Sequence, residues 1–365
     1  MKQSQLAKKF SGVSIKVINS LLPVLLAFLI GAVIILAIGE NPLETYGILI
    51  SRQLFTSRGF GNTLHYASPL ILTGLAIAIT FKANIYNMGV EGQLLFGAFF
   101  SGIVGAYYST GNAIVDKLLC FAVGVACGML FALLPALLKA YFHVDEMVVT
   151  LTFNYAMATV LEYLASGPFR DAGAGYVSTP AIQTSATFSR LGRSRLTLFF
   201  FIALAVFLVM WFLMKRTKLG YQITAIGKNA EFAEATGMRV RRKIIVLMLI
   251  SGALAGFAGA GYMMSEQYRY TLDFSGSPGL GWDGMLIALL GRHSPVGILI
   301  AALFYSVLKT GADTINTYTS VPKEIVAVIQ SLMILFLAVQ FLNERFGLLE
   351  RFKKLRRVKK EAADV

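Results

Sequence analysis

The sequence predicts an all-α polytopic membrane protein with about ten transmembrane helices. Of its 365 residues, 56% are hydrophobic and only 14% are charged, whereas about a quarter of the residues of a soluble domain are charged. The apolar residues gather in runs of about 20, which is the length of helix that crosses a bilayer core. The net charge is +14, but the basic residues collect between these runs, which argues against a nucleic-acid-binding surface.

Ten apolar runs are candidate spans, and nine of them are long enough to cross as ordinary helices. The eighth run, 282–291, is too short and is expected to form a half-helix or a broken span. Membranes tolerate such a span only where protein or a cavity covers its backbone. The runs lie near 17–39, 62–81, 85–108, 117–138, 146–166, 196–214, 244–264, 282–291, 295–312 and 323–342.

The orientation follows from the lysines and arginines. With the N-terminus inside, most of the 33 basic residues fall in inner segments, so the positive-inside rule places both termini in the cytoplasm. This gives a cytoplasmic segment 1–16, a transmembrane domain 17–342 and a basic cytoplasmic tail 343–365. The first run, 17–39, is longer than the apolar part of a signal peptide and is expected to be retained. We expect the tail to attract anionic lipid headgroups, with a partner protein as the alternative.

Two segments outside the apolar runs are informative. The outer loop 166–195 is rich in Gly, Ser and Thr and suits docking or gating. The inner segment 215–243 contains a predicted two-turn helix, with Asn229 as N-cap, Glu231 in the first turn and Gly237 as terminator. A helix this short is marginal alone and needs something to pack against. Its alanines and Phe232 offer a surface for another protein, and the alternative is an amphipathic connector on the membrane surface.

Three motifs resemble one family. The stretch GKNAEFAEATGM resembles the cytoplasmic coupling segment of ATP-binding-cassette (ABC) importer permeases, in the branch that carries simple sugars, nucleosides and branched-chain amino acids. The stretch NIYNMGVEGQLLFGAF resembles the Asn-x-Gly-x-Glu-Gly-Gln run of that branch, and ALLGRHSPVGILIAALF resembles its Gly-Arg-x-x-Pro-x-Gly segment. The resemblance covers about residues 60–342 and is nearest to the nucleoside permeases associated with basic membrane proteins.

The resemblance implies a multi-pass permease subunit of the bacterial cell membrane that imports nucleosides or related simple sugars. The chain has no Gly-x-x-x-x-Gly-Lys-Ser/Thr loop, so ATP hydrolysis is expected on partner ATPase subunits. Further implied partners are a second permease subunit, related but different, and an extracytoplasmic substrate-binding protein. The residues implied to couple to the ATPase are Gly227, Asn229, Ala230, Glu231, Phe232, Ala233, Ala235 and Gly237.

Polar residues inside the apolar runs are candidates for the substrate path, because burying them is costly. Glu91 lies between two glycines and either lines the path, caps a broken helix or accepts hydrogen bonds at a packed crossing. Trp282 with Asp283 suits a base or sugar, and an interfacial Trp-Asp end is the alternative. The other candidates are Asn154 and Glu162, which share a helix face, and His65, for which a packing role is the alternative.

Two other function classes are considered. An ion-coupled secondary transporter of a small polar solute would use carboxylates buried in the spans, and Glu91, Glu162 and Asp283 keep that alternative open. A membrane enzyme is disfavoured, since no HExxH, Gly-x-Ser-x-Gly or Cys/His cluster is present. No catalytic residue, cofactor or metal site is therefore expected.

Overall fold

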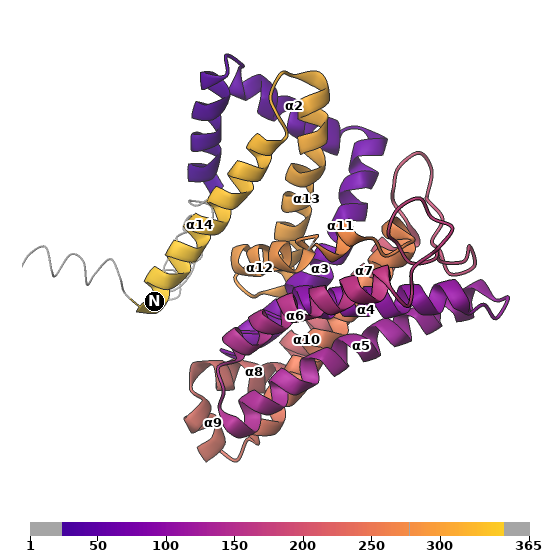
Figure 1. The fold of residues 1–365 in the computed structure, drawn as a ribbon. Helices are drawn as coiled ribbons and strands as arrows, with labels where there is room; N and C mark the ends of the chain where they lie inside the picture. The colour runs from indigo at the N-terminus through magenta and orange to yellow at the C-terminus, as the bar shows by residue number, and fades with distance from the viewer. Residues whose placement is uncertain (1–23, 277, 347–365) are drawn as a thin grey trace, which may run out of the picture. The chain divides into compact units, whose positions relative to one another are not determined.

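The computed structural model describes residues 24–276 and 278–346, with side chains up to residue 336. Its regular elements are helices, and the described residues otherwise contain two isolated β-bridges (Figure 1). Residues 53–310 form one compact unit, and the described residues before 53 and after 310 form a second, smaller one. The all-helical prediction is confirmed.

The larger unit is built around α3, a 25-residue helix that is almost entirely enclosed by protein. In its most apolar window 89% of the residues are buried, against 17% in α6 and 33% in α7. Apolar side chains of α6 and α7 therefore remain for lipid or another subunit to cover. The helices of this unit are α3 (Ser57–Phe81), α4 (Val90–Tyr107), α5 (Ala113–Phe142), α6 (Glu146–Ser166), α7 (Leu198–Arg216), α8 (Lys218–Lys228), α9 (Ala230–Ala235), α10 (Val240–Tyr262), the π-helix η1 (Met263–Gln267), α11 (Leu272–Ser275), α12 (Leu280–Leu290) and the first part of α13 (Pro295–Tyr318).

Glycines let α4, α5 and α10 approach backbone to backbone. A Cβ atom added at Gly256 of α10 would meet the carbonyl oxygen of Gly124 on α5, and one added at Gly128 would meet that of Gly252. Gly97 of α4 faces the backbone of Gly256 as well. Small residues spaced by four are typical of close crossings between membrane helices. These three helices therefore form one tightly packed block.

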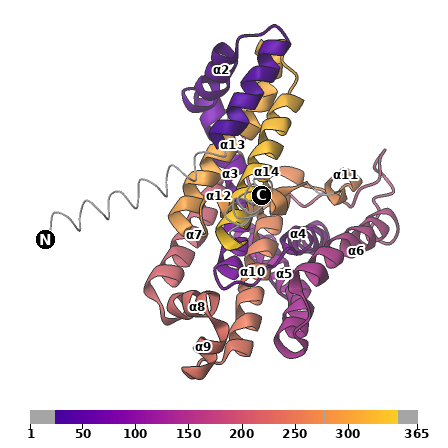
Figure 2. The ribbon, with the colours of Figure 1, turned by 90° about the vertical axis from the view of Figure 1, so that its left-hand side faces the viewer.

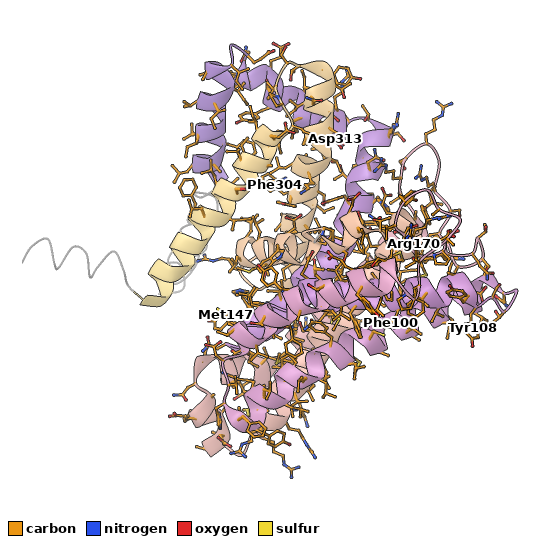
Figure 3. The ribbon with its side chains drawn as sticks, viewed as in Figure 1. Phe100, Tyr108, Met147, Arg170, Phe304 and Asp313 are labelled. Atoms are coloured by element: carbon orange, nitrogen blue, oxygen red, sulfur yellow. The ribbon has the colours of Figure 1, made fainter. Side chains whose placement is uncertain are left out.

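The predicted outer loop is a folded cap over one end of this block. Thr179 and Ile182 donate backbone hydrogen bonds to Tyr270 and Tyr268, and Phe188 donates one to Met264 in η1. In Figures 1 and 2 this loop and the α8–α9 pair lie at opposite ends of α10. Figure 3 likewise shows Tyr108 and Met147 at opposite ends of the unit, Tyr108 beside the loop.

The smaller unit contains helix Val24–Ala37, α2 (Pro42–Leu54), the end of α13 and α14 (Glu324–Phe346). The first helix and α2 are bent by 118° at a short break. Tyr46 of α2 donates a hydrogen bond to the carbonyl of Phe28 at 2.9 Å, which fixes this bend. The prediction assigned no helix to residues 40–61. Helix α2 forms there because its apolar residues lie on one face and its polar residues on the other.

The predicted runs compare with the helices as follows. Seven helices are long and apolar enough to cross a membrane, and the bent pair makes up to eight. They correspond to the second to seventh, the ninth and the first predicted runs. The short eighth run is the 11-residue α12, and the tenth is α14. The number ten and the side of the termini remain predictions. Segment 1–16, the start of the first run and the tail from 347 onward lie outside the described residues.

Candidate functional site

The predicted inner helix is present as α9, with the predicted caps. The Asn229 side chain accepts a hydrogen bond from the backbone N–H of Phe232 at 2.8 Å. At the other end Gly237 adopts a left-handed backbone (φ +86°), and Met238 N–H donates to the Ala233 carbonyl at 3.1 Å. This arrangement is a Schellman motif, which favours glycine at that position. The local sequence thus determines both ends of the helix.

The outward face of α9 differs from the predicted one at Ala233. Ala233 is only 1% exposed, so it packs inward and is not available to another protein. Phe232 is 68% exposed, although an aromatic ring normally avoids water. Glu231 and Ala230 are exposed beside it. Glu234 and Ala235 are exposed as well, so the surface that α9 presents combines an aromatic ring and two carboxylates with small residues.

Helix α8, which the sequence analysis did not predict, connects α9 to the centre of the larger unit. It begins after Thr217, whose hydroxyl accepts from the N–H of Gly220 at 3.4 Å. Near its end, a Cβ atom at Gly227 would meet the carbonyl oxygen of Lys82, which follows α3. Burial and then the nearby Lys215 ammonium lower the pKa of Lys82. Because it lacks a side chain, Gly227 lets α8 pack directly against the backbone of Lys82, just after α3.

The chain between α3 and α4 is held by side chains of α6. Glu146 accepts a hydrogen bond from the N–H of Tyr86 at 3.0 Å and pairs with Lys139 at 2.5 Å. Thr150 accepts from Met88 N–H at 3.0 Å, and the Asn154 amide donates to the Met88 carbonyl at 2.7 Å. These bonds replace the backbone partners that a non-helical segment at this depth lacks.

Asn87 and Gln93 of the Asn-x-Gly-x-Glu-Gly-Gln run form a second polar network. The Asn87 amide nitrogen donates to Ser251 Oγ of α10 at 2.9 Å, and its oxygen accepts from Gly89 N–H at 3.0 Å. Ser251 in turn donates to the Ala76 carbonyl of α3 at 2.7 Å. Asn87, Gln93 and Ser251 are all fully buried, so the motif joins α3, α4 and α10.

Glu91 caps the short helix α12. Its carboxylate accepts hydrogen bonds from the backbone N–H groups of Gly279, at 2.9 Å, and Gly281. Glu91 is only 3% exposed, and Gly281 leaves room for its carboxylate because a Cβ there would collide with it. The negative charge lies at the positive end of the α12 dipole. Of the readings given above, capping a broken helix agrees with this geometry.

Asp283, in the first turn of α12, faces α13. It accepts a hydrogen bond from the Tyr305 hydroxyl at 2.5 Å, and Lys309 lies 3.8 Å from its other oxygen. That oxygen is buried and accepts no hydrogen bond. Lys309 of α13 thus has a specific partner in Asp283. The neighbouring Trp282 is partly exposed.

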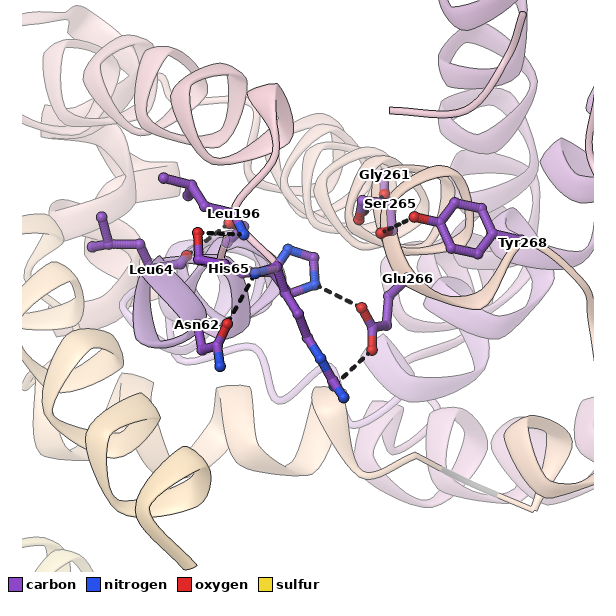
Figure 4. Close-up of polar contacts among 11 residues, drawn as sticks. Asn62, Leu64, His65, Leu196, Gly261, Ser265, Glu266 and Tyr268 are labelled. Atoms are coloured by element: carbon purple, nitrogen blue, oxygen red, sulfur yellow. Dashed lines mark hydrogen bonds and ion pairs between the residues drawn. The ribbon is translucent and has the colours of Figure 1, made fainter. Parts of the chain in front are cut away.

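His65 belongs to a cluster at the outer-loop end of the unit. Its imidazole faces the Glu266 carboxylate of η1 at 3.2 Å, and Arg195 pairs with the other Glu266 oxygen at 2.9 Å (Figure 4). The backbone N–H of Arg195 donates to the Asn62 side chain at 2.9 Å. Glu266 thus joins α3, the outer loop and the end of α10.

The path candidates are therefore distributed over separate places. Glu91 caps the start of α12, and Asp283 lies in the first turn of that helix with Tyr305 as its partner. Asn154 holds the segment before α4, and His65 lies in the outer cluster. Glu162 lies on α6, like Asn154, and is partly exposed. Of these two residues, Asn154 is the one that binds the segment before α4. Sequence reasoning missed Glu266 and Tyr305; the only available signal was a carboxylate just beyond the run 244–264.

Comparisons with known proteins agree with the three motifs. Residues 59–338 match the family described as branched-chain amino acid transport system, permease component. The nucleoside ABC transporter permease NupB of Lactococcus lactis is 33% identical over 342 residues, covering 90% of this chain and 92% of that one. The guanosine ABC transporter permease NupP of Bacillus subtilis is 33% identical over 88% and 92%. The glucose ABC transporter permease TsgB13 of Haloferax volcanii is 32% identical over 89% and 88%. No solved structure matches significantly.

Proposed function

Because this chain belongs to the permease components of the branched-chain amino acid transport family, we propose that it forms the membrane pathway of an ATP-driven importer of nucleosides or simple sugars. It is a multi-pass membrane permease, and the ATPase activity resides in partner subunits. The substrate class is supported by the similarity to nucleoside, guanosine and glucose permeases over about nine-tenths of the chain. The complete importer also contains a second permease subunit and a substrate-binding protein.

The single observation that carries the mechanism is the chain of backbone contacts from α9 to the centre. Helix α9 is capped by Asn229, which is also the C-cap of α8. Gly227 of α8 lies against the Lys82 carbonyl. Residues 82–89 continue from there to α4, anchored on α6 through Glu146 and on α10 through Asn87. A displacement of α9 by an ATPase subunit is therefore passed to α3, α4, α6 and α10 together.

The contact with the ATPase is assigned to the outward face of α9. Phe232 is the anchor, because an exposed aromatic ring buries a large apolar area when a pocket receives it. Glu231 and Ala230 surround it. The exposed Ala235 borders the same surface. The segment is shaped, and Phe232 is kept in place, by the buried Ala233 together with Gly227, Asn229 and Gly237.

Substitution of Phe232 tests this assignment. Phe232→Glu should abolish ATP-driven uptake of labelled guanosine or glucose into proteoliposomes and reduce co-purification of the ATPase, while the amount of folded permease stays unchanged. Tyr108→Glu is the matched control, since Tyr108 is equally exposed, at 68%, beside the outer loop. Uptake that continues without ATP but stops when the proton gradient is collapsed would instead establish a secondary transporter.

The proposed topology has ten crossings and both termini in the cytoplasm, counting the bent first pair, α12 and α14 as crossings. Charge placement supports this orientation. A cysteine at Asn229 should react with an impermeant maleimide only from the cytoplasmic side. Labelling from the outside would overturn both the topology and the coupling assignment.

Trp282 and Asp283 are the proposed path residues of α12. Glu91, Asn154 and His65 already use their polar atoms to hold backbone or Glu266, so their role in the path is to shape it; Glu162 is retained as a candidate on α6. Trp282 offers an aromatic face to a base or a sugar. Trp282→Ala should raise the KM for uptake, and Trp282→Phe should largely restore it.

A further inference from the structure

Four arginines surround a hollow at the outer-loop end of the larger unit. The hollow has a volume of about 240 Å³ and is lined by Arg58 at the start of α3 and by the arginines of the turn 190–195. Asn62, Gly192 and Ser194 complete its wall. The N-terminus of the 25-residue helix α3 adds to the positive potential there.

The turn that carries three of these arginines is held in a fixed conformation. Arg190 and Thr197 form an antiparallel bridge, and Leu191 N–H donates to the Leu196 carbonyl at 2.7 Å. Gly192 takes the left-handed backbone (φ +70°) that closes the turn. Ser194 rests on Gly61 of α3, where a Cβ would collide with it. The arginines therefore belong to an ordered turn that packs against α3.

The positive charge of this hollow is largely uncompensated. Arg195 pairs with Glu266 at 2.9 Å, and the more distant Arg190 charge acts on the same carboxylate. Arg58, Arg190 and Arg193 are exposed, and within the described residues their side chains form no ion pair or hydrogen bond. Like charges brought together cost free energy unless anions share them. Basic residues are also scarce on the outer side of membrane proteins, so their convergence indicates a ligand with several negative charges.

We propose that this hollow receives carboxylate side chains from an acidic face of the extracytoplasmic substrate-binding protein. This inference rests on the proposed function, which supplies that partner. Guanidinium groups bind carboxylates through paired hydrogen bonds and direct the orientation of docking. A soluble protein is favoured over a lipid headgroup because Arg58 and Asn62 in the wall of the hollow belong to α3, the helix most enclosed by protein.

Side-chain contacts connect the hollow to the helical core. Arg195 is shared between its rim and Glu266, and Glu266 faces His65 of α3. A docking carboxylate that draws the Arg195 guanidinium outward would weaken its pair with Glu266. The outer end of α10 and the N-terminal part of α3 therefore lie one contact from the docked protein (Figure 4).

The test measures docking directly. The permease–ATPase assembly in neutral-lipid nanodiscs is titrated with the purified substrate-binding protein of the same transporter, at low and high ionic strength. Arg58→Glu, Arg190→Glu and Arg193→Glu should each weaken binding about tenfold or more, in the range of charge pairs at protein interfaces. Arg193→Lys should lose less. Arg170→Glu is the matched control: it makes the same charge change on an exposed arginine of the outer loop outside the hollow, and it should bind like wild type.

The other occupants appear as distinct outcomes. Competition by millimolar inorganic phosphate with no loss in the charge-reversal variants would identify a phosphate site, and dependence on anionic lipid in the nanodisc would identify a headgroup site; either overturns the proposal. The Phe232→Glu permease should dock normally although it retains less ATPase and fails to transport, so docking and coupling fail separately. If Arg58→Glu, Arg190→Glu and Arg193→Glu all bind normally while ATP-driven uptake persists, the docking inference is wrong and the proposed function stands. If the wild-type assembly neither docks nor transports, both are wrong.

Discussion

Glu91 offers the sharpest test of how the interior is built. Its carboxylate satisfies two backbone N–H groups at the start of α12 and is almost completely buried. Each hydrogen bond to a charged group contributes about 1.5–3 kcal/mol. Glu91→Ala should therefore destabilise the protein by about 3–6 kcal/mol. Glu91→Gln, which retains one acceptor oxygen, should cost about half as much.

The assay is thermal unfolding of the purified permease in detergent. A loss of this size should lower the Tm of Glu91→Ala by roughly 5 °C or more. Glu44→Ala is the matched control, because Glu44 also lies in the first turn of a helix but is exposed, and it should cost less than about 1 kcal/mol. If Glu91→Ala unfolds at the wild-type temperature while the KM for uptake rises, Glu91 contacts substrate and the capping explanation is wrong.

Three further outcomes are expected. Gly256→Ala should destabilise the block by about 1–3 kcal/mol, because the new Cβ meets the Gly124 carbonyl; Gly47→Ala, in open space on α2, should not lower the Tm. Glu146→Ala should speed amide exchange at residues 82–89, and unchanged exchange would contradict the anchoring role. Burial, reinforced by Lys82 and Arg292, lowers the pKa of His293 from 6.5 to about 4. The unfolded chain then binds the proton first, so stability should fall between pH 6.5 and 4, and His293→Asn should flatten this fall in a pH series of melting curves.

The sequence predicted best where a single physical signal dominates. Apolar length located the helices from α3 to α7, and the caps Asn229 and Gly237 placed α9 to within a residue. The run 282–291 was expected to form a helix too short for a full span, and α12 has 11 residues, Leu280–Leu290. These features depend on local composition and backbone chemistry, which a sequence displays directly.

The sequence did not predict features that depend on tertiary partners. Helix α2 was missed because its polar face lowers the average hydropathy, and the π-helix η1 has no local signature. Glu91 was placed in a span without its partners, since Gly279 and Gly281 are 188 and 190 residues away. Ala233 was assigned to the outward face because nothing local distinguishes which side of a six-residue helix packs inward.

The glycine crossing of α4, α5 and α10 has a mechanical consequence. Side chains between helices can change rotamer and so absorb small displacements, but at Gly124, Gly128 and Gly256 the backbones approach each other directly. A displacement at the end of α10 near α9 is therefore transmitted along this block with little loss. The same close packing leaves no room for a larger side chain at these glycines. Substitutions that force the backbones apart would therefore block transport without changing any contact with the substrate.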